Sequence, residues 1–513
     1  MKGRHYDVIV LGRSIGALVA AALLARRDFS VLLLGQGARE ARYRLGERSL
    51  ARRPFSLFGA SSPALRRALV ELAQSQTFKR RGVALDPMLT VLLPDRRFEL
   101  PPDLRLFERE VDREFPEVRR VAADLYATLA KVNEAADAAF HRDVTWPPGT
   151  FWERRRTERA TAELPFFGQD GDLLADFPQF HPYRAVVLGT AAFASDLATG
   201  TRGLPAFAVA RLHGAWTRGV VTLAGGEAEL AQFFVDRIAA HGGSVSLDER
   251  VERVVATRAG VSGVVIDGDL GPTGCRFLVT DLPGEELAAL TGGEGLSTRA
   301  RREWPRVVPS TSRFVMSLVV RSEGVPTALG PETLAFGQPP GSTPDPRRPL
   351  VRLQRAGSGR EGEELLIAET LLGRGGLSKA DARLAVMGTL RSYFPWLERH
   401  LALVDSPHDG MSAWVYEDGV RHEVDRLKLT GATMRAEPME MQVDVEAPTF
   451  AGLAGEPVRG PLERAFLVGK TVLPALGQEG ELLAAVSAAR LITKSDPRRE
   501  KMRLEMWNKV EIG

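Results

Sequence analysis

The 513-residue sequence has a single cysteine, Cys275, so no internal disulfide can form. That composition is typical of a protein from a reducing compartment, and we expect a cytoplasmic location. No apolar run approaches the roughly 20 residues that span a bilayer, so no transmembrane helix is expected. The net charge of +3 is small for this length, and the sequence therefore predicts no nucleic-acid partner.

The sequence also lacks the common motifs of metal and hydrolytic sites. Its eight histidines are scattered, and none forms an H-x-x-x-H or H-E-x-x-H pair, so no metal site is predicted. Gly12 to Gly16 formally matches the G-x-S-x-G of α/β-hydrolases, but it follows the first strand, which leaves no upstream oxyanion loop. The cluster from Asp405 to Gly410 fits a plain turn better than a catalytic site. The sequence identifies no catalytic residues.

What the sequence does contain is a strand, a glycine-containing turn, a helix and a second strand near its N-terminus. Apolar residues up to Leu11 lead through the turn at 12–17 into an alanine-rich stretch, and a second apolar run covers 31–34. This order predicts the first βαβ unit of a dinucleotide-binding fold, whose turn and helix N-terminus receive a pyrophosphate. The usual second and third glycines are Ser14 and Ala17, and Gly35 stands where the ribose-binding acid is expected.

Two later blocks extend this pattern. Gly225-Gly226 precedes a helical segment and a β-ribbon at 251–266, and a buried strand ending at Gly469 precedes a helix over 481–492. Together the blocks predict an α/β fold, an interrupted Rossmann-like FAD/NAD(P)-binding domain with an inserted α+β substrate domain. We expect dinucleotide-binding segments at 1–75, 216–290 and 456–495, substrate-domain segments at 76–215 and 291–455, and a basic C-terminal tail at 496–513.

In these three blocks the chain resembles the FAD-dependent oxidoreductases of the phytoene desaturase and carotenoid isomerase type, within the amine-oxidase-related superfamily. The resemblance implies FAD as cofactor. The family's turn holds the pyrophosphate, its ribbon contacts adenine through the backbone, and its last helix faces the flavin. The positions that match these motifs, with Gln36 as a neutral substitute for the missing acid, are Gly12, Ser14, Gly16, Ala17, Gln36, Gly46, Arg48, Val251, Gly469, Lys470, Gln478, Glu479 and Gly480.

Four residues differ from the family's pattern, and they leave three interpretations of the function open. Ser14, Gly35, Glu47 and Lys470 differ from the family's pattern, Lys470 replacing an Asp. The resemblance implies an FAD-dependent desaturase or isomerase that acts on a lipophilic, polyene-like substrate by flavin hydride or electron transfer. An amine-oxidase-like flavoenzyme is a neighbouring alternative. The departures support a third reading, a non-catalytic nucleotide-binding or scaffolding protein that has lost FAD.

The C-terminal tail predicts a short helix with Met502, Met506 and Val510 on one side and basic residues elsewhere. Such a helix fits a peripheral contact with anionic lipid, and it fits equally well a helix docked on its own protein body. The sequence does not indicate the oligomeric state.

Overall fold

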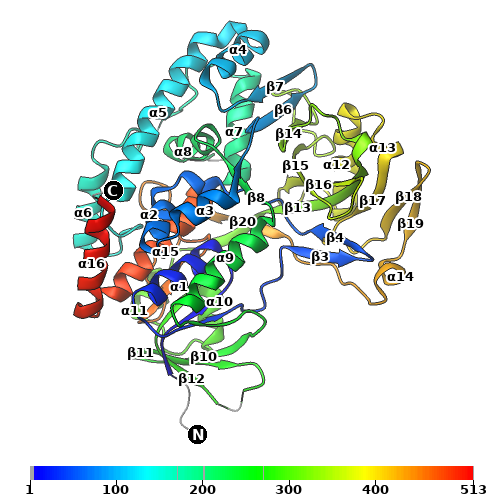
Figure 1. Ribbon diagram of the computed structural model, residues 1–513. Helices are drawn as coiled ribbons and strands as arrows, with labels where there is room; N and C mark the ends of the chain where they lie inside the picture. Colours follow the sequence, from blue (N-terminus) through cyan, green and yellow to red (C-terminus); the bar gives the residue numbers. More distant parts are fainter. Residues whose placement is uncertain (1–4, 170, 200–202, 270, 512–513) are drawn as a thin grey trace.

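The computed structural model describes residues 5–169, 171–199, 203–269 and 271–511. The described residues form two large β-sheets and two small two-stranded ones, with helices packed around them, and Figure 1 shows strands from distant parts of the sequence lying side by side.

The first sheet has the order β10-β11-β12-β1-β2-β9, with β21 paired to β12. Five of its strands are parallel, and they come from the beginning, the middle and the end of the chain. Residues 8–11 of β1 are fully buried, as is typical of a central strand in a parallel sheet, and the helix over 15–26 packs against β1, β2 and β12. The strands are β1 (His5–Leu11), β2 (Val31–Leu34), β9 (Ser244–Ser246), β10 (Val251–Thr257), β11 (Gly260–Ile266), β12 (Thr273–Thr280) and β21 (Ala465–Leu467).

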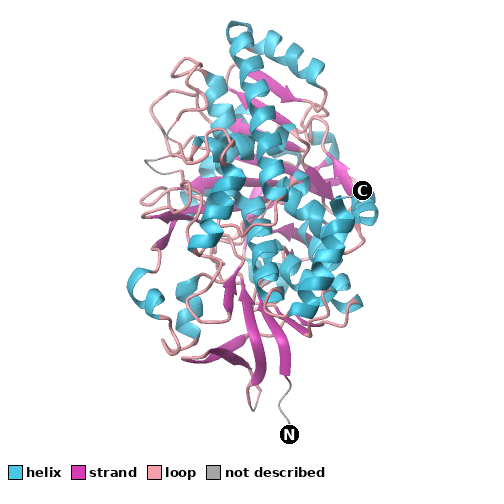
Figure 2. Cartoon of the chain, turned by 90° about the vertical axis from the view of Figure 1, so that its left-hand side faces the viewer, coloured by secondary structure: helices cyan, strands magenta, loops and turns pink. Residues whose placement is uncertain are grey.

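The ribbon β10–β11 is antiparallel and pairs with the start of β12, whereas the end of β12 pairs with β21. Figure 2 shows these strands extending at the N-terminal end of the molecule. The ribbon expected at 251–266 is therefore part of the first sheet.

Helix α1 (Ile15–Arg26) packs between α15 (Gly477–Thr493) and α9 (Gly226–Ala240). Its alanines make the helix thin enough for close neighbours, and residues 15–25 are all buried. Gly16 allows the closest approach, because a Cβ there would lie 2.1 Å from the carbonyl oxygen of Val468. The N-terminal and C-terminal blocks of the sequence are joined at this contact.

The second sheet has the order β19-β18-β17-β13-β16-β15-β14-β6-β7, with β20 paired to β13. It is antiparallel except where β14 meets β6, so strands at 89–100 join strands that begin after residue 306. The strands are β6 (Leu89–Leu93), β7 (Arg96–Leu100), β13 (Val307–Arg321), β14 (Glu332–Phe336), β15 (Leu350–Gly357), β16 (Glu363–Leu372), β17 (Leu401–Asp405), β18 (Ala413–Glu417), β19 (Val420–Val424) and β20 (Glu440–Val445).

Helices fill the space beside the two sheets (Figure 1). The remaining elements are β3 (Arg42–Leu45), β4 (Arg48–Ala51), α2 (Pro63–Glu71), α3 (Ser75–Arg81), β5 (Gly82–Ala84), α4 (Leu104–Glu114), α5 (Arg119–His141), α6 (Phe151–Thr161), α7 (Pro182–Ala194), α8 (Ala206–Thr217), β8 (Val221–Leu223), α10 (Gly284–Leu290), α11 (Thr298–Glu303), α12 (Lys379–Tyr393), α13 (Leu397–His400), α14 (Arg426–Thr430) and α16 (Pro497–Glu511). Among the described residues, no helix is both long and apolar enough to cross a bilayer.

The expected tail helix is α16, and it docks on the protein body. The guanidinium of Arg503 is buried and donates to both carboxylate oxygens of Asp143, each at 3.0 Å. The structure therefore shows that Arg503 anchors the tail helix to the protein body, which is one of the two interpretations given above.

Candidate functional site

The turn between β1 and α1 carries the backbone N–H groups that the sequence expects to receive a pyrophosphate. In the structure these groups bind oxygen atoms of the protein itself. The N–H of Ser14 donates to Oδ2 of Asp281 at 2.8 Å, and the N–H of Gly16 donates to Oε2 of Glu481 at 3.4 Å. The N–H of Ala17 donates to Oγ of Ser14, which caps the helix.

Asp281 lies directly on the turn. Gly12 has a φ of +116°, and a Cβ at Gly12 would lie 1.9 Å from a carboxylate oxygen of Asp281. The absence of a side chain at Gly12 therefore makes room for this carboxyl group. A glycine in this turn would otherwise let the backbone approach a phosphate.

Burial changes the ionisation of both carboxyl groups at the turn. It raises the pKa of Asp281, although the backbone N–H of Ser14 acts in the opposite direction. Burial, reinforced by the negative charge of Asp196, raises the pKa of Glu481 to about 8. Glu481 is thus largely protonated at neutral pH, and it is held without a full charge beside Asp281.

This shift predicts a pH-dependent effect of Glu481→Gln. The folded-state pKa of about 8 exceeds the ordinary value of 4.5, so the contribution of Glu481 to stability is complete below pH 4.5 and is lost as the pH rises to about 8. Glutamine stays neutral throughout. Chemical denaturation should therefore show that the free energy of unfolding of the variant increases relative to that of the wild type between these pH values. The increase is at most about 1.4 kcal/mol per pH unit. A difference in unfolding free energy that is constant with pH would contradict the shift.

The missing acid after β2 has a steric reason. A Cβ at Gly35 would lie 1.8 Å from the carbonyl oxygen of Leu247, so the chain that follows β9 excludes any side chain there. The next residue, Gln36, turns its carboxamide onto the ribbon. Its Nε2 donates to the carbonyl of Val251 at 3.1 Å, and its Oε1 accepts from the N–H of Val251 at 2.8 Å.

The structure therefore brings Gln36 and Val251 together, and they bind each other instead of a ligand. Both main-chain groups of Val251, which the resemblance assigns to adenine, are engaged by one side chain. A ligand at this position would have to displace the carboxamide.

The C-terminal block also has partners within the chain. Lys470 Nζ donates to the carbonyl of Met441 in β20 at 2.7 Å. The carboxamide of Gln478 donates to the carbonyl of Ser56 and accepts from the N–H of Gly59, at 3.0 and 3.1 Å.

Its remaining members hold the fold together. The Glu479 carboxylate binds the buried guanidinium of Arg211 at 2.6 and 2.7 Å. Gly469 and Gly480 are sites of close packing, because a Cβ would lie 2.1 Å from the Asp281 carbonyl and 2.3 Å from the Leu473 carbonyl respectively.

Gly46 and Arg48 do not join the turn. They lie in the β3–β4 hairpin, which packs beside the second sheet and α14, away from α1 (Figure 1). Arg48 pairs with both carboxylate oxygens of Glu363 in β16, at 2.8 and 3.2 Å. Arg53 instead pairs with Glu227 in α9; burial lowers its pKa, but Glu227 and, to a lesser extent, Glu481 and Asp196 raise it above its ordinary value.

Sequence reasoning missed four charged residues of this region: Arg53, Asp196, Asp281 and Glu481. Asp281 directly follows a strand that neighbours β1, and the carboxyl ends of parallel strands are where ligands bind in such sheets, so its position was open to inference. Glu481 directly follows the matched C-terminal block. The sequence around Asp196 and Arg53 contains no motif that would have assigned these residues to the turn region.

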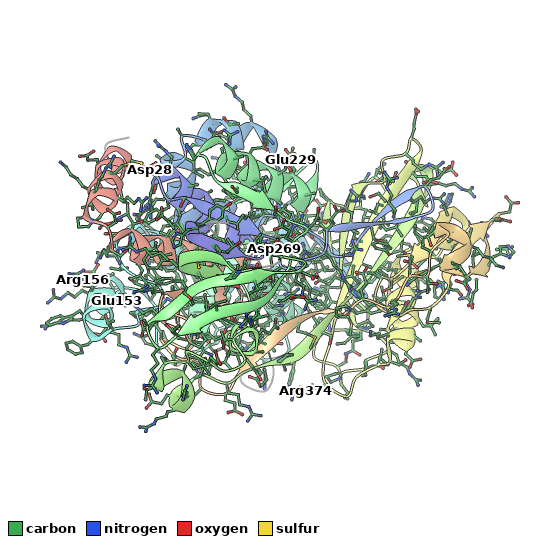
Figure 3. The ribbon with its side chains drawn as sticks, turned by 90° about the horizontal axis from the view of Figure 1, so that it is seen from below. Asp28, Glu153, Arg156, Glu229, Asp269 and Arg374 are labelled. Carbon is green, nitrogen blue, oxygen red and sulfur yellow. The ribbon has the colours of Figure 1, made fainter. Side chains whose placement is uncertain are left out.

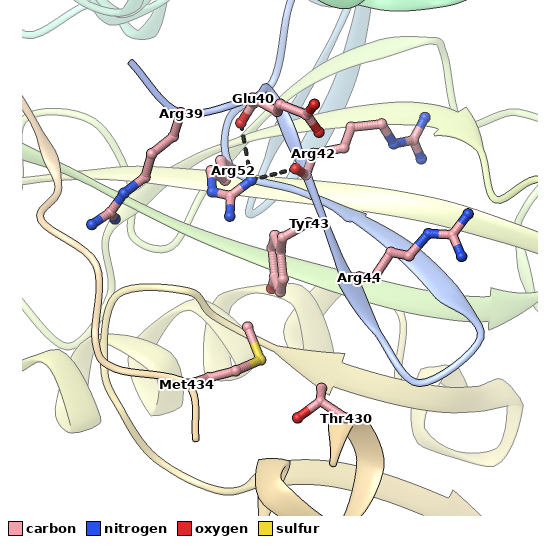
Figure 4. A pocket seen from close by; sticks show the side chains of 8 residues that line it. All are labelled: Arg39, Glu40, Arg42, Tyr43, Arg44, Arg52, Thr430 and Met434. Atoms are coloured by element: carbon pink, nitrogen blue, oxygen red, sulfur yellow. Dashed lines mark hydrogen bonds between the residues drawn. The ribbon is translucent and has the colours of Figure 1, made fainter. Parts of the chain in front are cut away.

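A surface pocket of about 370 Å³ lies between the β3–β4 hairpin and the chain after α14 (Figure 4). Tyr43 and Met434 line it, together with several arginines. Arg39 and Arg52 both pair with Glu437, at 3.1 and 2.7 Å, so this one carboxylate offsets part of their positive charge. The pocket belongs to the hairpin and is separate from the turn at Gly12.

The 405–410 cluster forms a turn, as expected, and its two carboxylates are buried against arginines. Asp405 binds Arg426 at 2.9 Å, and Asp409 binds Arg383 at 2.7 Å. These are ion pairs of the second sheet and its neighbouring helices. Among the described residues, no three His, Cys, Asp or Glu side chains are grouped so as to hold a metal ion.

Comparison with solved structures identifies the fold. The chain is similar to an oxidoreductase from Methanosarcina mazei, with a TM-score of 0.57, 13% identity and coverage of 94% of this chain and 99% of that one. It is also similar to cyclohexylamine oxidase from Brevibacterium oxydans, with a TM-score of 0.52, 15% identity and coverage of 96% and 99%. A third similar structure is a putrescine oxidase variant with redesigned cofactor binding. Its TM-score is 0.51 at 13% identity, with coverage of 95% of this chain and 99% of that one.

The chain therefore has a mixed α/β fold with a parallel sheet, similar to the folds of these structures. No family model and no curated protein sequence matches it.

The residues present do not fit the ADP half of FAD in the position that this fold implies. A pyrophosphate needs free N–H groups at the turn, and Asp281 and Glu481 engage them. Adenine needs the main-chain groups of the ribbon, and Gln36 engages those.

Proposed function

We propose that this chain keeps the fold of the FAD-dependent oxidoreductases as a non-catalytic scaffold and works without FAD. The observation that carries the proposal is that the chain's own side chains bind the groups on which an ADP moiety depends. Asp281 accepts from the turn at Ser14, and Gln36 pairs with both main-chain groups of Val251.

Electrostatics adds to this argument. A pyrophosphate would bring negative charge to a turn where the Asp281 carboxyl already lies on Gly12. Two like charges about 4 Å apart repel by about 4 kcal/mol at the effective dielectric of a partly buried site. That repulsion corresponds to roughly three decades in affinity. If Asp281 were protonated instead, its carbonyl oxygen would still occupy the N–H of Ser14.

A second candidate function is an FAD-dependent oxidoreductase. It is favoured by the similarity in fold to cyclohexylamine oxidase and putrescine oxidase. In this case an amine and the lipophilic, polyene-like compound expected from the sequence are alternative substrates. Binding of FAD would require Asp281 and Gln36 to leave the positions in which they are found.

The visible spectrum of the purified protein separates the two candidates. We expect protein expressed with ample riboflavin to be colourless and to release no flavin on heating. Isothermal titration with FAD should then show no saturable binding, because the turn donors and Val251 are engaged. Near-equimolar flavin in the heat-released fraction, or saturable uptake of FAD, would establish the second candidate and exclude the first.

A further inference from the structure

Two aromatic side chains project from the surface at the start of α6. Phe151 and Trp152 are 69% and 67% exposed, and their rings meet edge to face with centroids 5.4 Å apart. Adjacent large aromatic residues with this exposure form an apolar patch that the fold itself leaves uncovered.

The chain holds this patch firmly in place. Thr150 and Glu153 form a reciprocal capping box, in which the Glu153 N–H donates to Thr150 Oγ1 at 3.3 Å and the Glu153 carboxylate accepts from the Thr150 N–H at 3.1 Å. The same carboxylate binds Arg459 at 2.8 and 2.9 Å, which ties the helix start to the chain before β21. The exposed rings are thus presented by a fixed helical turn.

The exposed charges near the two rings are mostly basic, because four arginines of α6 outnumber its exposed Glu158. Arg154, Arg155 and Arg156 follow directly, and Arg159 lies one turn later, all of them exposed. In the described part of the chain, Arg154, Arg155 and Arg156 make no ion pair, and Glu153 is neutralised by Arg459. Figure 3 shows Arg156 at the outer edge of the molecule, on the same side as α16.

We propose that these residues, named here the α6 patch (Phe151, Trp152, Arg154, Arg155, Arg156 and Arg159), dock the protein on an anionic membrane surface. Trp and Phe favour the boundary between headgroups and acyl chains, and arginines beside them pair with anionic headgroups. Each basic residue near such a surface contributes a roughly fivefold gain in binding. The arrangement provides both signals, an apolar anchor and a compensating charge, without crossing the bilayer.

Charge favours a lipid surface over a second copy of the chain. Docking two α6 patches against each other would bring their unpaired arginines together. The helix α16 lies on the same side in Figure 1, and its Leu504 is 42% exposed, so a flat anionic surface could meet both helices. This inference is independent of whether FAD binds.

Co-sedimentation of the full-length protein with lipid vesicles tests the proposal. We expect binding to vesicles that contain phosphatidylglycerol and no binding to phosphatidylcholine alone. The double substitution Phe151→Ser, Trp152→Ser should weaken binding at least tenfold, and so should the triple Arg154→Gln, Arg155→Gln, Arg156→Gln. The matched control is Phe180→Ser, which removes an equally exposed ring (67%) outside the patch and should leave binding unchanged.

Circular dichroism would confirm that the variants fold, which the exposure of the replaced side chains leads us to expect. Failure of the wild type to sediment with anionic vesicles would overturn the proposal. So would an equal loss with Phe180→Ser, or a dimer in solution that the Phe151→Ser, Trp152→Ser variant converts to a monomer.

Discussion

Replacing Arg211 with methionine should lower the free energy of unfolding by about 3–5 kcal/mol, the usual cost of removing one partner of a buried ion pair. Arg211 is 1% exposed, and its Nε and Nη2 donate to the two oxygens of Glu479 at 2.6 and 2.7 Å. Without the guanidinium, the Glu479 carboxylate stays buried at the start of α15 and loses its main partner. Denaturant titration of both proteins measures the difference.

The matched control is Arg66→Met. Arg66 pairs with Asp137, which also binds Arg211, but its side chain is 53% exposed, so its loss should cost less than about 1 kcal/mol. The double variant Arg211→Met, Glu479→Leu should recover part of the stability, because the buried Glu479 carboxylate is then removed together with its partner. Equal effects of Arg211→Met and Arg66→Met would show that Glu479 is not held by the fold, and would leave it free for a ligand.

Clearing the turn and the ribbon should create affinity for ADP and FAD. Asp281→Ala removes the carboxyl group that lies against Gly12, and it frees the N–H of Ser14. Gln36→Ala frees both main-chain groups of Val251. Each regained hydrogen bond is worth about 1.5–3 kcal/mol when it is made to the charged pyrophosphate and about 0.5–1.5 kcal/mol when it is made to neutral adenine. We therefore expect Asp281→Ala to tighten ADP binding at least about tenfold, and the double variant to tighten it about a hundredfold.

Isothermal titration with ADP and with FAD measures these constants. Glu47→Ala is the control, because it removes a carboxylate that is 84% exposed in the hairpin and pairs with Arg360 away from the turn. Binding of FAD by the wild type as tight as by the double variant would refute the proposal that the site is self-occupied. Absence of binding in every variant would show that other residues close the site.

The order of elements could be predicted because the signals are local. The wholly apolar segments of β1 and β2 predict strands buried on both faces, and the alanine-rich segment between them predicts a closely packed helix. The three separated blocks do meet, in one parallel sheet.

The occupants of the site could not be predicted. Ser14 and Asp281 are 267 positions apart, and Gly16 and Glu481 are 465 positions apart, so only the pairing of β1 with β12 and the packing of α15 on α1 bring them together. The hairpin that carries Gly46 and Arg48 matched a motif, yet it packs on the second sheet. A motif records residue types and spacing, whereas the partner of each side chain depends on which surfaces the chain brings into contact.

By itself, the sequence determined the main elements of the first sheet and the assembly of its parallel strands, because periodicity and glycine turns act over a few residues. Only the tertiary structure decided what the turn at Gly12 binds. A backbone N–H takes the nearest suitable acceptor, and here the fold supplies that acceptor from the end of β12 and the start of α15.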